Sequence, residues 1–169
     1  MAEKLSLRDY QRDLAERLRA AEGSRTSSML ALQVAEEGWL VDLADAGEVI
    51  PVPLVTPVPL TRPWFKGMTN IRGNLFSVID FPAFLGGAAS AVTPESRLLL
   101  IGERFRMGAA LLVDRSLGLR NPAQLKRREG AAGAPWLKAE HADEEGRVWK
   151  ELDVGQLVQH QDFLTVSVS

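Results

Sequence analysis

The side chains best suited to binding chemistry lie within one short segment, residues 64–80. This segment is built mainly from large apolar residues, and Lys66, Asn70 and Arg72 interrupt it. Arginine can hold a carboxylate or a carbonyl through a planar fork of N–H donors, whereas lysine offers only a compact charge. Any one of these three polar residues could be a solvated surface residue, so their occurrence together in one apolar segment is the feature to explain.

Residues that could carry catalysis are few. Only His141 and His160 could act as bases near neutral pH, and neither lies in a known catalytic motif. Cysteine is absent, which excludes a cysteine nucleophile, a disulfide framework and a thiolate metal site. The sequence has no Gly-x-Ser-x-Gly motif and no phosphate-binding glycine loop. We expect a protein that is not an enzyme, with no catalytic residues, no metal and no cofactor.

Several carboxylates have a structural explanation. The acidic run 143–145 could bind a metal or act in acid–base catalysis, but adjacent carboxylates in a strand and turn point apart. A hairpin tip is therefore the preferred interpretation, with His141 beside it at the surface. Asp80 and Asp114 each end an apolar run. We expect each to cap the turn that follows by accepting backbone N–H groups.

The composition is that of an ordinary globular protein: 169 residues, 46% hydrophobic and 25% charged. A net charge of −2 predicts no general attraction to nucleic acid or anionic membranes. The first residues lack the apolar core of a signal peptide, and no run approaches the roughly 18 apolar residues of a membrane span. We expect a soluble cytoplasmic protein with no direct membrane insertion and no nucleic-acid partner.

The elements that must position Arg72 form a hairpin. Residues 67–71 favour one strand, and residues 75–81 favour a second that is rich in β-branched and aromatic side chains. Arg72-Gly73-Asn74 is a turn, because Gly and Asn tolerate the positive φ that hairpin turns require. We assign Gly67 and Gly73 to backbone geometry, and expect Asn70 to bond nearby backbone amides.

The rest of the chain consists mostly of short apolar runs separated by turn signals. This pattern predicts an all-β fold, a small barrel or paired barrels. Residues 120–135 are less regular, with a solvated turn at 126–128 and a flexible connection at 130–135. Asp153 is suited to cap a short helix through Val158. We expect further strands at residues 29–34, 38–43, 47–50, 97–102, 105–114, 136–141, 147–152 and 163–168.

Five prolines between residues 51 and 63 exclude a helix there and remove backbone donors. We expect an extended segment that lies at a sheet edge or crosses between sheets, and its valines and leucines offer apolar surface to bury. The alternative is a polyproline ligand for an SH3-type partner.

The N-terminal part is the one clear helical segment. Residues 4–22 place Leu7, Tyr10, Leu14 and Leu18 at helical spacing, with charged residues elsewhere. The small polar residues 23–28 suit a helix stop and a linker. We expect the helix to pack back on the domain, and the alternative is a docking handle for a partner. The chain then divides into an extension with its linker, residues 1–27, and a β domain, residues 28–169.

Residues 66–80 read K-G-x-x-N-x-R-G-x-x-x-x-V-I-D, which resembles the signature of the CheW-like coupling proteins of bacterial chemosensory arrays. Similarity to this family continues from about residue 29 to the C-terminus, in Trp39-Leu40-Val41-Asp42, Ala110-Leu111-Leu112-Val113-Asp114 and residues 147–153. The resemblance implies a CheW-like fold: two intertwined five-stranded SH3-like β-barrels that share a core, here with an N-terminal helical extension.

The same resemblance implies a non-catalytic adaptor. Its expected partners are a CheA-type histidine kinase, through that kinase's CheW-like regulatory domain, and the cytoplasmic tips of methyl-accepting chemoreceptors. It implies that Glu48 and Arg72 bind partners, and Lys66 and Asn70 match positions of the motif. The N-terminal extension, residues 114–119 and residues 160–166 are most like family members that serve type IV pili and twitching motility.

Two alternatives stay open at this point. A CheW-like adaptor of a flagellar chemotaxis array would carry the same motif. A small β-barrel that binds nucleic acid is more distant, because it needs a basic groove with stacking aromatic residues. Here the aromatic residues gather in the core-like hairpin, among them Trp64, Phe65 and Phe76.

Overall fold

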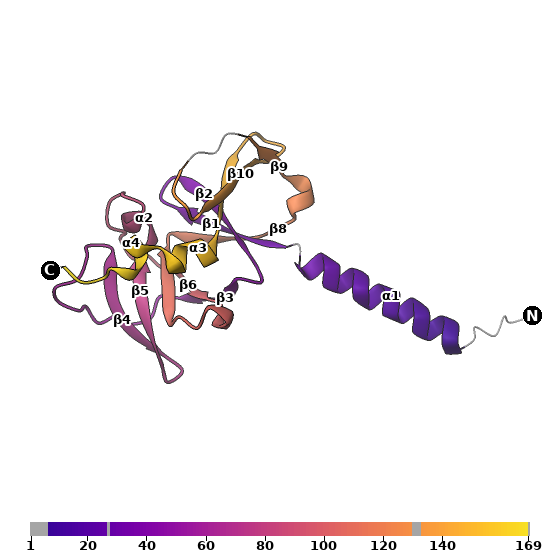
Figure 1. The fold of residues 1–169 in the computed structure, drawn as a ribbon, viewed down its shortest axis with the longest axis horizontal. Helices are drawn as coiled ribbons and strands as arrows, with labels where there is room; N and C mark the ends of the chain where they lie inside the picture. Colours follow the sequence, from indigo (N-terminus) through magenta and orange to yellow (C-terminus); the bar gives the residue numbers. More distant parts are fainter. Residues whose placement is uncertain (1–6, 27, 130–132, 169) are drawn as a thin grey trace, which may run out of the picture.

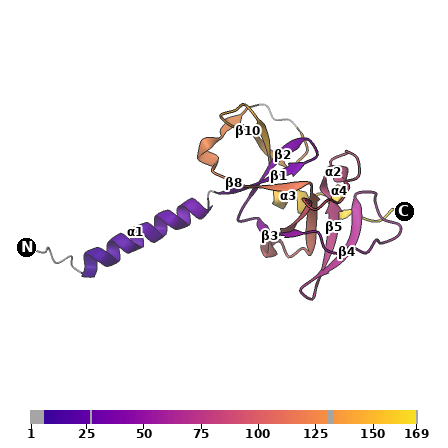
Figure 2. The ribbon, with the colours of Figure 1, turned by 180° about the vertical axis from the view of Figure 1, so that it is seen from behind.

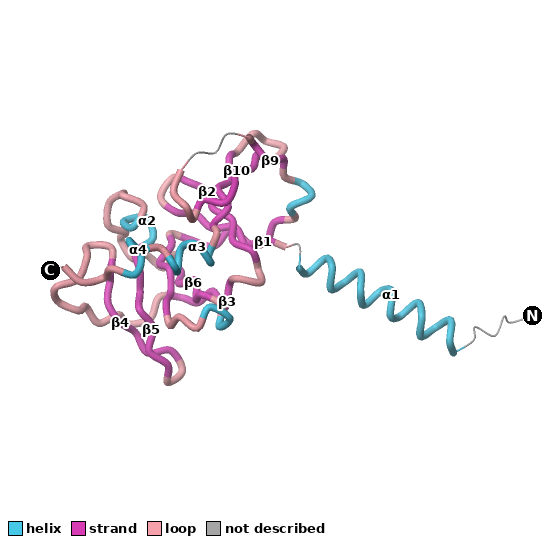
Figure 3. The backbone as a smooth tube through the Cα atoms, viewed as in Figure 1, coloured by secondary structure: helices cyan, strands magenta, loops and turns pink. Residues whose placement is uncertain are grey.

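The computed structural model describes residues 7–26, 28–129 and 133–168. Two β-sheets dominate it (Figures 1 and 3). The six-stranded sheet has the order β8-β1-β2-β11-β10-β9, and the five-stranded sheet has the order β3-β6-β7-β5-β4. The strands are β1 (Met29–Val34), β2 (Glu37–Asp42), β3 (Ala46–Pro51), β4 (Phe65–Ile71), β5 (Asn74–Asp80), β6 (Arg97–Ile101), β7 (Ala109–Val113), β8 (Arg115–Arg120), β9 (Lys126–Arg128), β10 (Leu137–Ala142) and β11 (Val148–Leu152).

The two sheets are intertwined along the chain. The backbone forms β1 and β2 in the six-stranded sheet, crosses to build β3 to β7, and then returns for β8 to β11. The return is closed by a parallel pairing of β2 with β11, in which Gly38 lies opposite Trp149 and Val41 opposite Leu152. Early and late parts of the chain therefore share one sheet, and the middle part forms the other.

The largest apolar core lies between the sheets. Trp39 on β2 meets Phe81, which directly follows β5, edge to face with ring centroids 5.3 Å apart. Burying an apolar side chain of this size contributes about 1.5–3 kcal/mol. Five short helical elements in the described ranges connect or cover the strands: α2 (Phe81–Phe84), α3 (Val154–Gln159), α4 (Gln161–Leu164) and two 3-10 turns at Glu103–Phe105 and Pro122–Gln124. Among the residues buried in this core are Leu32, Val41, Ile79, Leu99, Leu111, Val113, Leu152 and Leu157.

Most predicted strands are present, but two predictions for the second half are wrong. Residues 163–168 do not form a strand: Phe163 is buried within α4, and His160 starts this helix by accepting the N–H of Asp162 through Nδ1 at 3.2 Å. Capping and aromatic packing outweigh the alternating pattern there. The basic run 126–128 is an exposed edge strand, β9, rather than a turn. Of the predicted connection at 130–135, residues 130–132 lie outside the described part of the chain.

The proline-rich segment, residues 51–63, is hydrogen-bonded to strand β4 of the same domain. The backbone N–H and C=O of Thr56 bond Met68 of β4 at 2.8 and 2.9 Å, and Thr69 Oγ1 donates to the carbonyl of Leu54 at 2.7 Å. Val52 and Val55 pack against a second cluster of buried apolar residues in the five-stranded sheet, whereas Leu54 is exposed. This cluster consists of Ile71, Val78, Leu98, Leu100, Ala110 and Leu112. The predicted extended segment is confirmed, lying against the edge strand β4.

Helix α1 (Leu7–Thr26) does not pack on the domain as expected. Figures 1 and 2 show it extending away from both sheets, and Leu7, Tyr10, Leu14 and Leu18 are all exposed. The helical pattern correctly indicated an apolar face, but such a pattern does not reveal what covers it. The predicted helix stop is also misplaced, because a glycine inside a helix costs about 1 kcal/mol without necessarily ending it. None of the helices in the described ranges is long and apolar enough to cross a membrane.

Candidate functional site

The candidate site brings together two predicted residues that are 24 positions apart. Arg72 Nη2 lies 2.6 Å from Glu48 Oε1. Glu48 lies on β3, one edge strand of the five-stranded sheet, and Arg72 lies at the tip of the hairpin that includes the other edge strand, β4. The sheet must curl for these side chains to meet. Both remain open to solvent, with the side chain of Arg72 70% exposed and that of Glu48 45% exposed.

Backbone geometry at the hairpin tip presents the arginine. Ile71 pairs with Asn74, which leaves a two-residue turn. Both turn residues have positive φ, 53° at Arg72 and 84° at Gly73, as tight hairpin turns require. The expectation that Asn74 shares this conformation is wrong, because Asn74 begins β5. An arginine with positive φ is uncommon.

Asn70 stabilises this turn from within. Its Oδ1 accepts the backbone N–H of Gly73 at 2.9 Å, so the expected bond to a nearby backbone amide is present. The hydrogen bond orders the loop that carries Arg72. Asn70 thus has a structural task, and its contact with a partner stays a prediction.

The ion pair keeps both side chains charged. The hydrogen bond from Arg72 lowers the pKa of Glu48 below its ordinary value, and the same bond to Glu48 raises the pKa of Arg72. At neutral pH the site therefore presents one carboxylate and one guanidinium.

Glu48 and Arg72 line a groove of about 550 Å³. Its floor and walls combine apolar side chains with further charges, which is an arrangement suited to a segment of another protein. The sequence alone did not indicate the remaining wall of this groove, because its members come from the end of β6 and the loop before β7. They include Leu100, Ile101, Glu103, Arg106 and Met107, and they face Ile71 and Phe76 of the β4–β5 hairpin across the groove.

Lys66 lies apart from this groove. Its Nζ donates to the carbonyl of Ser90 at 3.2 Å and lies 3.8 Å from Asp80 Oδ2. Asp80 is fully buried and caps α2, as predicted, by accepting the N–H of Ala83 at 3.2 Å. It also accepts the N–H and hydroxyl of Ser90 at 2.7 and 2.8 Å. Lys66 thus compensates a buried charge, and its role in partner binding stays a prediction.

The two glycines assigned to backbone geometry differ in their surroundings. Gly67 has φ 141°, and a Cβ there would lie 2.1 Å from the carbonyl oxygen of Thr56. Gly73 has φ 84° with open space around it. Gly67 lets the proline-rich segment approach β4, whereas Gly73 serves only the turn.

The other carboxylate predictions have mixed outcomes. Asp114 does not cap the following turn but accepts the backbone N–H of Ala35, which joins it to the β1–β2 hairpin. His141 is not at the surface: its side chain is 13% exposed, and its Nε2 lies 2.7 Å from Glu151 Oε2. No group of three or more metal-binding side chains occurs within the described ranges.

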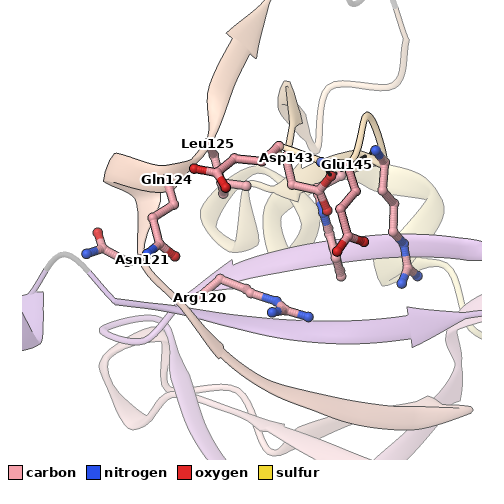
Figure 4. A pocket seen from close by; sticks show the side chains of 9 residues that line it. Arg120, Asn121, Gln124, Leu125, Asp143 and Glu145 are labelled. Carbon is pink, nitrogen blue, oxygen red and sulfur yellow. Dashed lines mark hydrogen bonds between the residues drawn. The ribbon is translucent and has the colours of Figure 1, made fainter.

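The acidic run 143–145 forms the predicted hairpin tip and borders a second groove of about 290 Å³ (Figure 4). Asp143 accepts N–H groups from Arg147 and from the indole of Trp149, at 2.9 and 3.0 Å. Arg120 and Arg147 lie over the Trp149 ring, 5.3 and 4.3 Å from its centroid. No sequence pattern indicated this cluster, because its members come from β8, the turn and β11.

Comparisons with known proteins agree with this architecture. Residues 28–162 match the family model of the CheW-like domain. The chain is 31% identical to Protein PilI of Pseudomonas aeruginosa over 136 residues, which is 77% of this chain and 74% of PilI. It is 34% identical to Protein FrzA of Myxococcus xanthus over 73 residues, 43% of this chain and 45% of FrzA. It is 25% identical to Chemotaxis protein CheW of Thermotoga maritima, over 59% of this chain and 64% of that protein.

A solved structure supports the fold. The scaffolding protein TtCheW of Thermoanaerobacter tengcongensis matches with a TM-score of 0.64 and 18% sequence identity, covering 76% of this chain and 89% of TtCheW. The expected CheW-like fold of two SH3-like barrels with an N-terminal helix is confirmed, and one of the two sheets has a sixth short strand, β9. The family model and the PilI similarity each span most of the chain, and on that evidence the protein belongs to the CheW-like family.

Proposed function

We propose that this protein is an adaptor that links a CheA-type histidine kinase to the tips of chemoreceptors in the cytoplasm, within a system that controls type IV pili. Membership of the CheW-like family supports a non-catalytic coupling role. Similarity to PilI over 77% of the chain favours the pilus system. The observation that carries the proposal is the solvent-facing pair of Glu48 and Arg72 beside an apolar groove.

The groove and the pair would act together in binding the kinase. Apolar contacts with side chains such as Phe76 and Met107 supply contact area, and charged groups set the register of the partner. A guanidinium carries five N–H donors, and the bond to Glu48 uses Nη2. The exposed arginine therefore keeps donors for a carboxylate or carbonyl of the partner.

The second candidate is an adaptor of a flagellar array. The similarity to Chemotaxis protein CheW of Thermotoga maritima favours it, although that similarity is lower and shorter than the one to PilI. Both candidates predict the same binding site, so they differ only in which kinase is bound.

A binding titration tests the proposal. The purified protein is titrated with the CheW-like regulatory domains of the pilus-associated and the flagellar CheA-type kinase of its own genome. We expect selective binding to the pilus kinase, weakened at least about tenfold by Arg72→Ala or Glu48→Ala without loss of thermal stability. Arg128→Ala is the matched control, because Arg128 is also an exposed arginine next to a carboxylate, Glu140, but lies on β9.

A charge reversal distinguishes a binding role from a structural one. If the pair only stabilises the fold, the double variant Glu48→Arg/Arg72→Glu should restore binding that each single variant loses. We expect the double variant not to restore binding, because Glu48 and Arg72 would each contact a different group of the kinase. Binding to neither kinase, or full binding by Arg72→Ala, would refute the proposed role of this site. The variants Lys66→Ala and Asn70→Ala belong in the same titration, and we expect their effects to accompany a loss of stability.

A further inference from the structure

Helix α1 has an apolar face that nothing in the described structure covers. Leu7, Leu14 and Leu18 are 73%, 46% and 57% exposed, and Tyr10 lies beside them. The helix is 20 residues long and extends away from both sheets in two opposite views (Figures 1 and 2). It lies outside the residues that match the CheW-like family model.

Most helices in proteins gain their stability by packing an apolar face rather than from helix propensity. Two ion pairs within α1, Asp13 with Arg17 at 3.0 Å and Arg12 with Glu16 at 4.0 Å, add a little support. Exposed pairs of this kind do not replace a packed face. The helix therefore needs a partner surface.

The shape of the apolar face indicates another helix as that surface. A helix that packs on a globular core has an apolar stripe at least about 100° wide, whereas a coiled-coil seam is narrower. In α1 the leucines follow a heptad pattern, with Leu7 and Leu14 at d positions and Leu18 at an a position. Gln11 and Arg25 occupy the other a positions and Ala21 the third d position. A polar residue in a seam is a known device for setting register, at a cost in stability.

The charges of α1 fit a second copy of the same helix in parallel orientation. In a parallel pair each g position faces the e position five residues later on the partner helix. Arg17 is at g, and the sequence places Glu22 at e, five residues later. The wider flanks also differ in charge: Arg8, Arg12 and Arg19 lie at e and b positions on one side, whereas the other side carries Asp13 at c beside Arg17 at g. Parallel pairing places unlike flanks together, and antiparallel pairing places like flanks together.

We propose that α1 pairs in parallel with α1 of a second copy of this chain, forming a short two-stranded coiled coil that holds two adaptors together. An anionic membrane surface is a poorer match, because five arginines in α1 are offset by four acidic residues. The proposal goes beyond kinase coupling and does not depend on it.

Sedimentation of the full chain over a range of concentrations tests the pairing. We expect a reversible dimer whose dissociation constant rises at least about tenfold in Leu14→Glu, which equals about 1.4 kcal/mol. Ala20→Glu is the control, since Ala20 is also exposed on α1 but lies away from the seam. A monomer at all concentrations, or a dimer that Leu14→Glu leaves unchanged, would overturn the proposal.

Cysteine cross-linking tests the orientation, and the natural chain without cysteine gives a clean background. In a parallel pair position 11 faces its own copy within disulfide reach. We expect Gln11→Cys to form a disulfide-linked dimer and Arg12→Cys, on the outer face, to remain mostly monomeric under the same oxidation. Failure of Gln11→Cys to cross-link more than Arg12→Cys would refute parallel pairing. Kinase titration of Leu14→Glu, which should be unchanged, separates this result from the proposed coupling function.

Discussion

Replacing Gly67 and Gly73 in turn with alanine tests how the hairpin is built. Both residues lie in the same β4–β5 hairpin and both have positive φ, so each alanine introduces backbone strain. They differ in their neighbours. A Cβ at position 73 meets nothing within 4 Å, whereas a Cβ at position 67 would lie 2.1 Å from the carbonyl oxygen of Thr56. That contact cannot be relieved by turning a side chain, because the obstacle is backbone.

The difference between the two variants follows from this clash. To accept the new methyl group at position 67, Thr56 must move away from β4 and lose its two backbone hydrogen bonds to Met68, of 2.8 and 2.9 Å. Each bond contributes about 1 kcal/mol. Backbone strain adds about 1–2 kcal/mol at position 73, whose φ of 84° is close to the left-handed region. It is no smaller at position 67, because φ 141° lies outside the regions that L-residues adopt. We therefore expect Gly67→Ala to be less stable than Gly73→Ala by about 2 kcal/mol or more.

Thermal unfolding of the wild type and both variants measures this difference. For a chain of this size about 1 kcal/mol corresponds to 2–4 °C in Tm. Gly67→Ala should melt about 4–8 °C below Gly73→Ala, and Gly73→Ala should melt below the wild type. Equal Tm values for the two variants would refute the close approach of the proline-rich segment to β4 as the reason for Gly67.

Two further predictions concern carboxylates outside the groove. Asp80→Ala should lower the free energy of unfolding by about 3 kcal/mol, because Asp80 accepts three hydrogen bonds at about 1 kcal/mol each. A denaturant titration that shows a change below about 1 kcal/mol would contradict this prediction. The hydrogen bond from Trp149, together with backbone N–H groups of Arg147 and Glu145, lowers the pKa of Asp143 below its ordinary 3.8. Its stabilising effect is complete above that value and is lost as the pH falls through the lower pKa of the folded state. Stability measured between about pH 5 and pH 2 should therefore fall less steeply in Asp143→Asn than in the wild type, and identical slopes would contradict the assignment.

Local sequence was a good guide wherever neighbouring residues decide the structure. The caps at Asp80 and Asp153 and the hairpin tip at 143–145 form as predicted, and so does the hairpin around Gly73 except that Asn74 belongs to the strand. Each depends on backbone preferences and hydrogen bonds within a few residues. The predictions failed where distant packing decides. Phe163 belongs to a helix because its ring joins an aromatic cluster with Trp64 and Phe84.

The candidate site divides in the same way. The motif of residues 66–80 includes Arg72, and the resemblance to the CheW-like family indicated Glu48 as well. Nothing in the sequence indicated that these two side chains form an ion pair. Lys66 and Arg72 are six positions apart in one motif, yet Lys66 turns to the buried Asp80 while Arg72 faces solvent. A β-strand alternates its faces, but which face is buried depends on the rest of the sheet.

The sequence by itself determined the family, the hairpin with its turn residues and the amphipathic character of α1, because all of these are properties of residue type and local spacing. The tertiary structure alone decided the wall of the groove, the pairing of Glu48 with Arg72 and the exposure of the α1 leucines. The groove wall and the ion pair depend on strand order and sheet curvature, which arise from contacts between residues far apart in the chain. The leucines are exposed because α1 extends away from both sheets.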